Sequence, residues 1–182
     1  MARILIGTLL LVIGAGARDP LGACGDKYLN LGLGTHYHLS AAERRAAAIL
    51  IYATPNSELS KLLAALSVDD AMKKAGYHAT FASSSDQLDA VLRARNWDVV
   101  VVDAADANSV SPRVAKASGA PRVLPVLTRP TKEELKRAEK IYDVVLNAPS
   151  KNRVFVEGVD DAIDVHAFEM AEAARAAKRS TR

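Results

Sequence analysis

The stretch WDVVVVDAADA, residues 97–107, places four consecutive valines directly before an aspartate, Asp103. A short unbroken run of β-branched residues is typical of a strand buried on both faces, as in a parallel sheet. In open parallel sheets, functional groups gather beyond the carboxyl ends of the strands. The stretch therefore predicts a central strand, and it makes Asp103 the first candidate for a functional residue.

Outward from this strand, short apolar runs alternate regularly with helical patterns. Strands are predicted for AAILIYA, HATFAS, DVVVVD, RVLPVLT and DVVLNAPS, at residues 47–53, 78–83, 98–103, 122–128 and 143–150. Strict alternation with short loops indicates a parallel sheet whose right-handed crossovers cover both faces. We therefore expect an α/β fold: a flavodoxin-like, doubly wound, five-stranded parallel sheet of order 2-1-3-4-5 with helices on both faces.

Cap residues predict where the intervening helices begin and end. The first crossover covers residues 56–77 and includes Gly76, which suits a left-handed C-cap. Three further helix starts are predicted from polar caps, at Ser84, Ser111 and Thr131. The last helix is expected from about Asp161 and leads into a basic tail at residues 176–182.

The composition limits the classes of function. Hydrophobic residues make up 49% of the 182 residues and charged residues 25%, which is enough for one sizeable core. Aromatic residues make up only 5%, and the net charge is +3. Neither value supports stacking on, or electrostatic binding to, nucleic acid, so no nucleic-acid partner is expected.

The N-terminal stretch MARILIGTLLLVIGAGA, residues 1–17, has the order of a secretory signal peptide. An early arginine precedes an apolar run, and small residues stand at Ala15 and Ala17. The 14 residues from Ile4 to Ala17 would reach about 21 Å as a helix. That is too short for a hydrocarbon core of about 30 Å. We therefore expect export, with cleavage after Ala17.

The single cysteine, Cys24, follows Leu-Gly-Ala, a sequence that resembles the lipobox of bacterial lipoproteins. The polar residues 18–20 separate the apolar run from this box, which favours cleavage after Ala17 over lipidation of Cys24. The expected location is periplasmic, or at the membrane as a lipoprotein if Cys24 is lipidated. Residues 18–45 are expected to form an extended strap or linker before a domain at 46–175.

From about residue 47 to 175, the order and spacing of these segments resemble the receiver domain of response regulators. WDVVVVD matches the strand that carries the phosphoacceptor, RVLPVLT the strand that ends in a Thr or Ser switch, and DVVLNAPS the strand that ends in Lys-Pro. The resemblance implies that Asp103 stands at the phosphoacceptor position and Thr128 at the switch position. It also implies an extra turn in residues 55–74, because the family's first crossover is usually shorter.

The residues that receiver chemistry needs around Asp103 are replaced in this sequence. Phosphoryl transfer requires a Mg²⁺ ion held largely by carboxylates, but the family's acid pair falls on Ala53 and Thr54. The family's lysine falls on Ala148, directly before the retained Pro149. We therefore expect a degenerate, non-catalytic receiver without a cofactor, in which Asp103 accepts hydrogen bonds from the loop behind it.

Two classes of function remain open for such a chain. The first is an exported pseudo-receiver that binds a protein of the cell envelope. The second is a metal- or thiol-using envelope protein in which Cys24, His36 and His38 carry the chemistry. A receiver that is phosphorylated on Asp103 is a further alternative.

Overall fold

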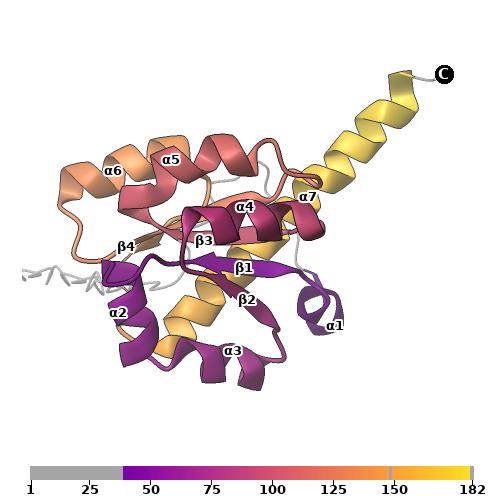
Figure 1. The fold of residues 1–182 in the computed structure, drawn as a ribbon. Helices are drawn as coiled ribbons and strands as arrows, with labels where there is room; N and C mark the ends of the chain where they lie inside the picture. The colour runs from indigo at the N-terminus through magenta and orange to yellow at the C-terminus, as the bar shows by residue number, and fades with distance from the viewer. Residues whose placement is uncertain (1–38, 148, 181–182) are drawn as a thin grey trace, which may run out of the picture.

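A computed structural model of the chain describes residues 39–147 and 149–180. Within these residues, a five-stranded parallel sheet has the order β2-β1-β3-β4-β5, which confirms the expected fold (Figure 1). The strands are β1 (Ile49–Tyr52), β2 (Ala79–Ala82), β3 (Val99–Asp103), β4 (Arg122–Leu127) and β5 (Leu146–Asn147). The helices are α1 (Ala41–Arg45), α2 (Glu58–Ala65), α3 (Val68–Ala75), α4 (Ser85–Ala94), α5 (Ala104–Val114), α6 (Lys132–Ile141) and α7 (Asn152–Ser180).

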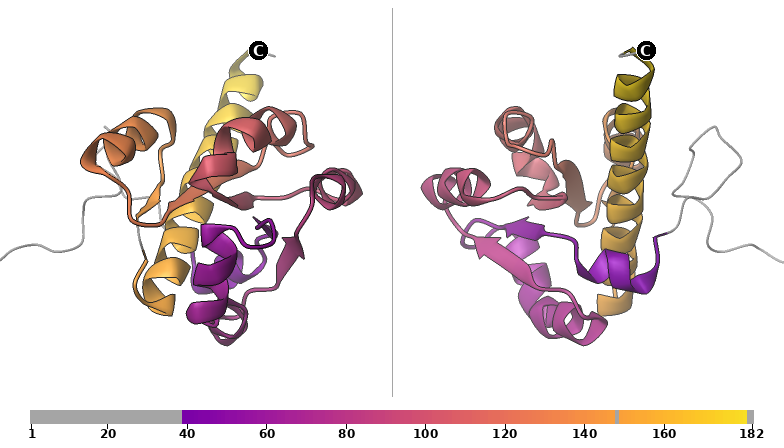
Figure 2. Two further views of the ribbon diagram at one scale, coloured as in Figure 1. Left: turned by 60° about the vertical axis from the view of Figure 1, so that its left-hand side comes forward. Right: turned by 90° about the vertical axis from the view of Figure 1, so that its right-hand side faces the viewer.

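The helices lie in two layers, one on each face of the sheet (Figures 1 and 2). Alternate residues of a strand point to opposite faces, so the valine run of β3 serves both layers. Val99 and Val101 pack in a cluster with residues of α2, α3 and α7, whereas Val100 and Val102 pack with residues of α4 and α5. Every residue of β1 and β3 is buried, which explains their continuous apolar pattern.

The first crossover consists of two helices, α2 and α3, in agreement with its predicted extra turn. The break lies at Ser67, whose φ of 47° is a left-handed conformation. Helix α3 ends at Gly76, whose φ of 90° is that of a C-cap glycine. A Cβ atom on Gly76 would also lie 2.7 Å from Cδ of Arg45, but that flexible side chain can move, so the left-handed backbone is the reason for glycine at this position.

Helix α5 begins earlier than the sequence predicted. It starts directly after Asp103, which is its N-cap, and the predicted cap at Ser111 is wrong. The cause is the aspartate itself, since Asp is a strong N-cap residue and the alanine-rich turn that follows favours helix. Ser111 lies inside the helix and donates its hydroxyl to the Ala107 carbonyl at 2.7 Å.

Helix α7 also begins before its expected start near Asp161. Phe155, Val159 and Ile163 are all buried, and their spacing continues one apolar face through the first turns of the helix. The residues expected as a basic tail at 176–182 belong, as far as they are described, to the last turns of α7. These turns project beyond the sheet (Figures 1 and 2).

Helix α6 differs from the other long helices because none of its residues is buried. The capping box predicted at Thr131 is present: the Glu134 amide donates to Thr131 Oγ1, and the Thr131 amide donates to the Glu134 carboxylate. Ile141 in its last turn is 67% exposed. Tyr142, just after the helix, packs partly on the α4 and α5 cluster. Helix α6 therefore adds little to the core.

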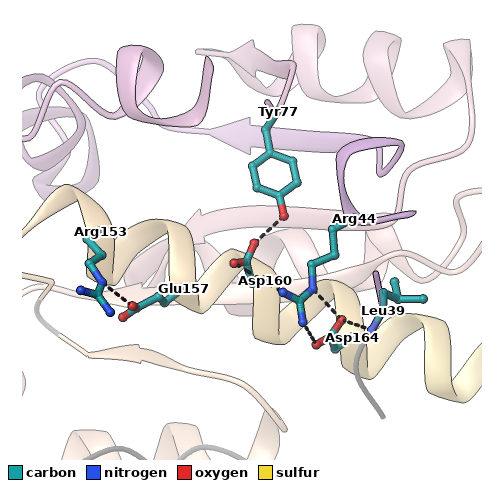
Figure 3. Close-up of polar contacts among 7 residues, drawn as sticks. All are labelled: Leu39, Arg44, Tyr77, Arg153, Glu157, Asp160 and Asp164. Carbon is teal, nitrogen blue, oxygen red and sulfur yellow. Dashed lines mark hydrogen bonds and ion pairs between the residues drawn. The ribbon is translucent and has the colours of Figure 1, made fainter. Parts of the chain in front are cut away.

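The segment before β1 differs from the extended strap expected for residues 18–45, because it contains the capped helix α1. Arg44 of α1 binds the Asp164 carboxylate of α7 through Nε at 3.0 Å and Nη2 at 2.6 Å (Figure 3). The Leu39 amide donates to the same carboxylate at 3.1 Å. Contacts of the fold thus reach back to Leu39, before the expected domain start at Ala46.

Figure 3 also shows a second link to α7, from the hydroxyl of Tyr77 to the carboxylate of Asp160. Arg44 of α1 and Tyr77, which follows α3, thus both bind carboxylates of α7. The burial of Tyr77 and its bond to Asp160 raise the pKa of the Tyr77 hydroxyl. At neutral pH this hydroxyl is therefore protonated and can donate to Asp160.

Several predictions concern residues 1–38, which lie outside the described part of the chain: the signal peptide at 1–17, Cys24, His36 and His38. Among residues 39–147 and 149–180, no helix combines the length and the apolar character needed to cross a membrane.

Candidate functional site

The carboxyl edge of the sheet brings three of the predicted positions together. Strands β1 and β3 pair in parallel up to Tyr52 and Val102, so the next residues along, Ala53 and Asp103, are neighbours. Ala53 packs against the cluster on the α2 face. Asp103 pairs with β4 two residues before Thr128, and Thr128 lines a cavity together with residues of α2. The three positions therefore share one corner of the sheet.

The carboxylate of Asp103 is held between two helices. The residue is 8% exposed. Its Oδ2 accepts a hydrogen bond from the Leu59 amide of α2 at 3.0 Å, and its Oδ1 accepts one from the Ala105 amide of α5 at 3.1 Å. Both donors lie in the first turn of a helix, where amides lack partners and the helix dipole is positive. The arrangement engages both oxygens of the carboxylate.

The positions beside Asp103 that would hold the family's acid pair carry neutral side chains. The Ala53 amide donates to the Ala82 carbonyl at 3.0 Å, and the Thr54 carbonyl accepts a hydrogen bond from the Ser57 amide at 3.1 Å. Within the described residues, no group of three or more His, Cys, Asp or Glu side chains is arranged to hold a metal ion. Ala148, the position of the family's lysine, lies outside the described residues.

A second acid, Asp106, stands close enough to Asp103 to affect its own protonation. Burial, and then the charge of Asp103, raise the pKa of the Asp106 carboxyl. Asp106 in turn contributes, after burial, to the raised pKa of the Tyr52 hydroxyl. Asp106 lies in the first turn of α5, rather than at the end of β1 where a receiver has its acid pair.

Three charged residues at this corner were missed by the sequence analysis: Glu58, Lys61 and Arg129. Together with Thr128 and the buried Pro149, they line a cavity of about 350 Å³. Glu58 Oε1 lies 2.7 Å from Lys61 Nζ, and this hydrogen bond is the main cause of the lowered pKa of Glu58. The cations of this corner thus come from α2 and from the turn after β4.

A larger cavity, of about 510 Å³, opens between α5 and α6 and reaches Asp103 and Thr128 at its inner end. We call it the α5–α6 groove. Apolar residues form much of its lining: Ala107, Pro125, Leu127, Ala138 and Ile141. Its polar side chains include Arg129 and Arg137. The candidate site is therefore a buried aspartate that binds the first turns of two helices, with an amphipathic groove beside it.

Comparison with known proteins supports the fold assignment. The chain is similar to a solved structure described as a response regulator from Thermotoga maritima, with a TM-score of 0.50 and 17% sequence identity. The similarity covers 64% of this chain and 98% of that one. No protein-family model matches the chain, and no curated protein matches its sequence. At this identity the likeness is one of fold: the described residues form a receiver-like domain, and its function must be argued from the site.

Proposed function

We propose that the protein is a receiver-like interaction module that binds a protein partner without phosphoryl transfer. The observation that carries the proposal is the engagement of both Asp103 oxygens by the first turns of α2 and α5. A phosphoacceptor needs a carboxylate oxygen that is free to attack phosphorus, and a cation that neutralises the phosphoryl oxygens. Here the oxygens of Asp103 cap helices.

The neighbouring residues support the same proposal. Ala53 and Thr54 supply no ionised oxygen to a Mg²⁺ ion, which binds proteins mainly through one or two carboxylates. Without turnover, the domain acts through its surfaces. The described residues leave helix α6 exposed, and the end of α7 projects beyond the sheet.

We further propose that the protein is exported, supported by the apolar run and small residues of segment 1–17. Export would also separate the domain from cytoplasmic kinases. Intact-mass and N-terminal analysis of the protein made in a bacterial host test this. A mature start at Arg18 is expected, and a start at an acylated Cys24 would give the lipoprotein form. An unprocessed Met1 in the cytoplasm would contradict export.

A Mg²⁺ titration tests the loss of the metal site. Calorimetry measures binding, and thermal unfolding measures the effect of the metal on stability. The unmodified protein is expected to show no saturable binding at millimolar Mg²⁺. The triple variant Ala53→Asp, Thr54→Asp, Ala148→Lys restores the family's residues and should bind Mg²⁺, with a melting temperature that rises with metal concentration. Saturable binding by the unmodified protein, abolished by Asp103→Asn, would overturn the proposal. A triple variant that binds no metal would show that these positions do not match a receiver site.

A further inference from the structure

The α5–α6 groove presents two guanidinium groups that make no hydrogen bond within the described part of the chain. Arg129, from the turn after β4, and Arg137, from α6, both line the groove. Neither makes a hydrogen bond or an ion pair with residues 39–147 or 149–180, although Arg129 helps to lower the pKa of Glu58 and Arg137 that of Glu134. Guanidinium groups bind carboxylates through two parallel N–H···O bonds. The pair therefore offers a place for an acidic group.

The acids of the same groove are already engaged. Both oxygens of Asp103 accept backbone amides. Glu134 accepts the Thr131 amide at 2.8 Å, a bond that is the main cause of its lowered pKa, and Glu58 is paired with Lys61. Helix termini or a cation therefore offset each negative charge. Within the described residues, the charged groups of the groove that still lack a hydrogen-bond partner are the two guanidiniums.

The backbone at Arg129 is unusual for an arginine. Its φ of 62° is in the left-handed region, which side chains other than glycine rarely adopt. Disfavoured backbone conformations of this kind are concentrated at binding and active sites. Glycine would be the unstrained choice at this position, but it would remove a guanidinium from the mouth of the groove.

The remaining lining of the groove is apolar and partly open to solvent. Pro125 and Leu127 of β4 are buried, while Ala138 and Ile141 belong to α6. Since α6 has no buried residue, none of the described residues covers the Ala138 and Ile141 side chains that line the groove. Exposed apolar surface beside charged groups is typical of interaction sites. An occupant should therefore combine an apolar group with an acidic one.

We propose that the α5–α6 groove binds a segment of a partner protein in which acidic side chains alternate with apolar ones. The acidic side chain binds Arg129 and Arg137, and the apolar side chain covers Leu127 and Ile141. A cavity of about 510 Å³ is in the size range of sites that hold a ligand or a few side chains. This inference rests on the proposed function, and it adds the chemistry of the partner.

The test uses the full chain and three short fluorescent peptides, with binding followed by anisotropy. The first peptide alternates Glu with Leu, the second has Gln in place of Glu, and the third has Ser in place of Leu. Only the first is expected to bind, with a dissociation constant below about 1 mM, because it alone satisfies both the arginines and the apolar wall.

Two substitutions remove the arginines while keeping the fold. Arg129→Gly retains the left-handed backbone, which glycine adopts freely, so stability should be unchanged or higher. Arg137→Gln retains helix propensity. Each should weaken binding of the Glu–Leu peptide about tenfold or more, as expected for loss of a charge-assisted pair. The matched control is Lys136→Gln, a neighbour on α6 that does not line the groove, and it should retain binding.

Three results would overturn this inference. The first is the absence of binding by all three peptides. The second is any sign of a general attraction of acids to the surface. Either Lys136→Gln and Arg137→Gln lose binding equally, or the third peptide, with Ser in place of Leu, binds as well as the Glu–Leu peptide. The third is displacement of the Glu–Leu peptide by millimolar inorganic phosphate, which would indicate a small-anion site. The proposed function fails separately, if the unmodified protein binds Mg²⁺ at Asp103.

Discussion

At Asp103, one carboxylate joins two helices that are distant in sequence. It caps α5 through the Ala105 amide and binds the first turn of α2 through the Leu59 amide. The sequence analysis expected a structural role with donors from the following loop. It could not identify α2 as a partner, because nothing in a sequence pattern shows that Leu59 will lie beside the end of β3. The residue that resembles a phosphoacceptor thus stabilises the start of two crossovers.

Asp103→Asn is expected to lower the free energy of unfolding by about 2 kcal/mol. The amide turns an NH₂ group toward a backbone donor and removes the charge that both helix termini favour. Urea unfolding followed by circular dichroism measures the change. The control is Asp106→Asn, which should leave stability unchanged or raise it, because burial already raises the pKa of Asp106. Equal costs for the two variants would contradict the capping role.

Asp161 of α7 gives a pH-dependent prediction. Burial, and then the charges of Asp164 and Asp160, raise the pKa of the Asp161 carboxyl. The folded chain therefore holds this proton to higher pH than the unfolded chain, so stability is lost as the pH rises above the usual carboxyl pKa of about 4. Asp161→Asn avoids that loss.

Melting temperatures measured from pH 3 to pH 7 test this prediction. Asp161→Asn should match the unmodified protein at pH 3 and exceed it at pH 7. The matched control on the same helix is Glu172→Gln, which loses an exposed pair with Arg175 at 2.8 Å and should bring no gain at pH 7. A gain that is the same at both pH values would exclude titration of Asp161 as its cause.

At the scale of elements, α1 and α7 are joined by a charge pair that the sequence did not reveal. The Asp164 side chain is 2% exposed and is bound by two nitrogens of Arg44. Removing one partner of a buried pair leaves the other charge poorly compensated, which typically costs 3–5 kcal/mol. Arg44→Met should therefore destabilise the fold by about 3 kcal/mol, measured by urea unfolding.

The double variant Arg44→Met, Asp164→Asn is the control, because it removes both charges. It should be more stable than Arg44→Met alone, as a double-mutant cycle requires of coupled residues. Additive costs would contradict the coupling. A chain shortened to begin at Arg45 should be destabilised like Arg44→Met, since it also loses Arg44 and the Leu39 amide.

Strands β1, β3 and β4 were predictable because each is a short, largely buried apolar run, and period and length are then enough. Strands β2 and β5 are only partly buried, and their place in the alternation of strands and helices supported their prediction. Helix starts were less predictable where two polar residues competed as caps. Ser111, followed by a proline, has the pattern of an N-cap, but Asp103 begins the helix earlier. The start of α7 was missed because Val154 and Phe155 follow the last strand pattern after only three residues, 151–153, and their apolar face was not connected to that of Ile163.

At the scale of the whole molecule, strand order brings the candidate site together. Order 2-1-3-4-5 makes the ends of β1, β3 and β4 neighbours, so a corner containing Ala53, Asp103 and Thr128 could be predicted. Arg129 could not, because its place in the groove depends on a left-handed turn that no sequence signal marks. The Glu58–Lys61 pair had only its helical spacing as a signal.

The central claim, that this receiver-like domain does not undergo phosphoryl transfer, is tested most directly by intact-mass analysis after incubation with acetyl phosphate and millimolar Mg²⁺. The unmodified protein and Asp103→Asn are each expected to keep the mass of their untreated form, because Asp103 caps two helices and Ala53 and Thr54 stand where the family's acid pair holds the metal. A gain of one phosphoryl group by the unmodified protein, absent in Asp103→Asn and removed by hydroxylamine, would contradict the claim.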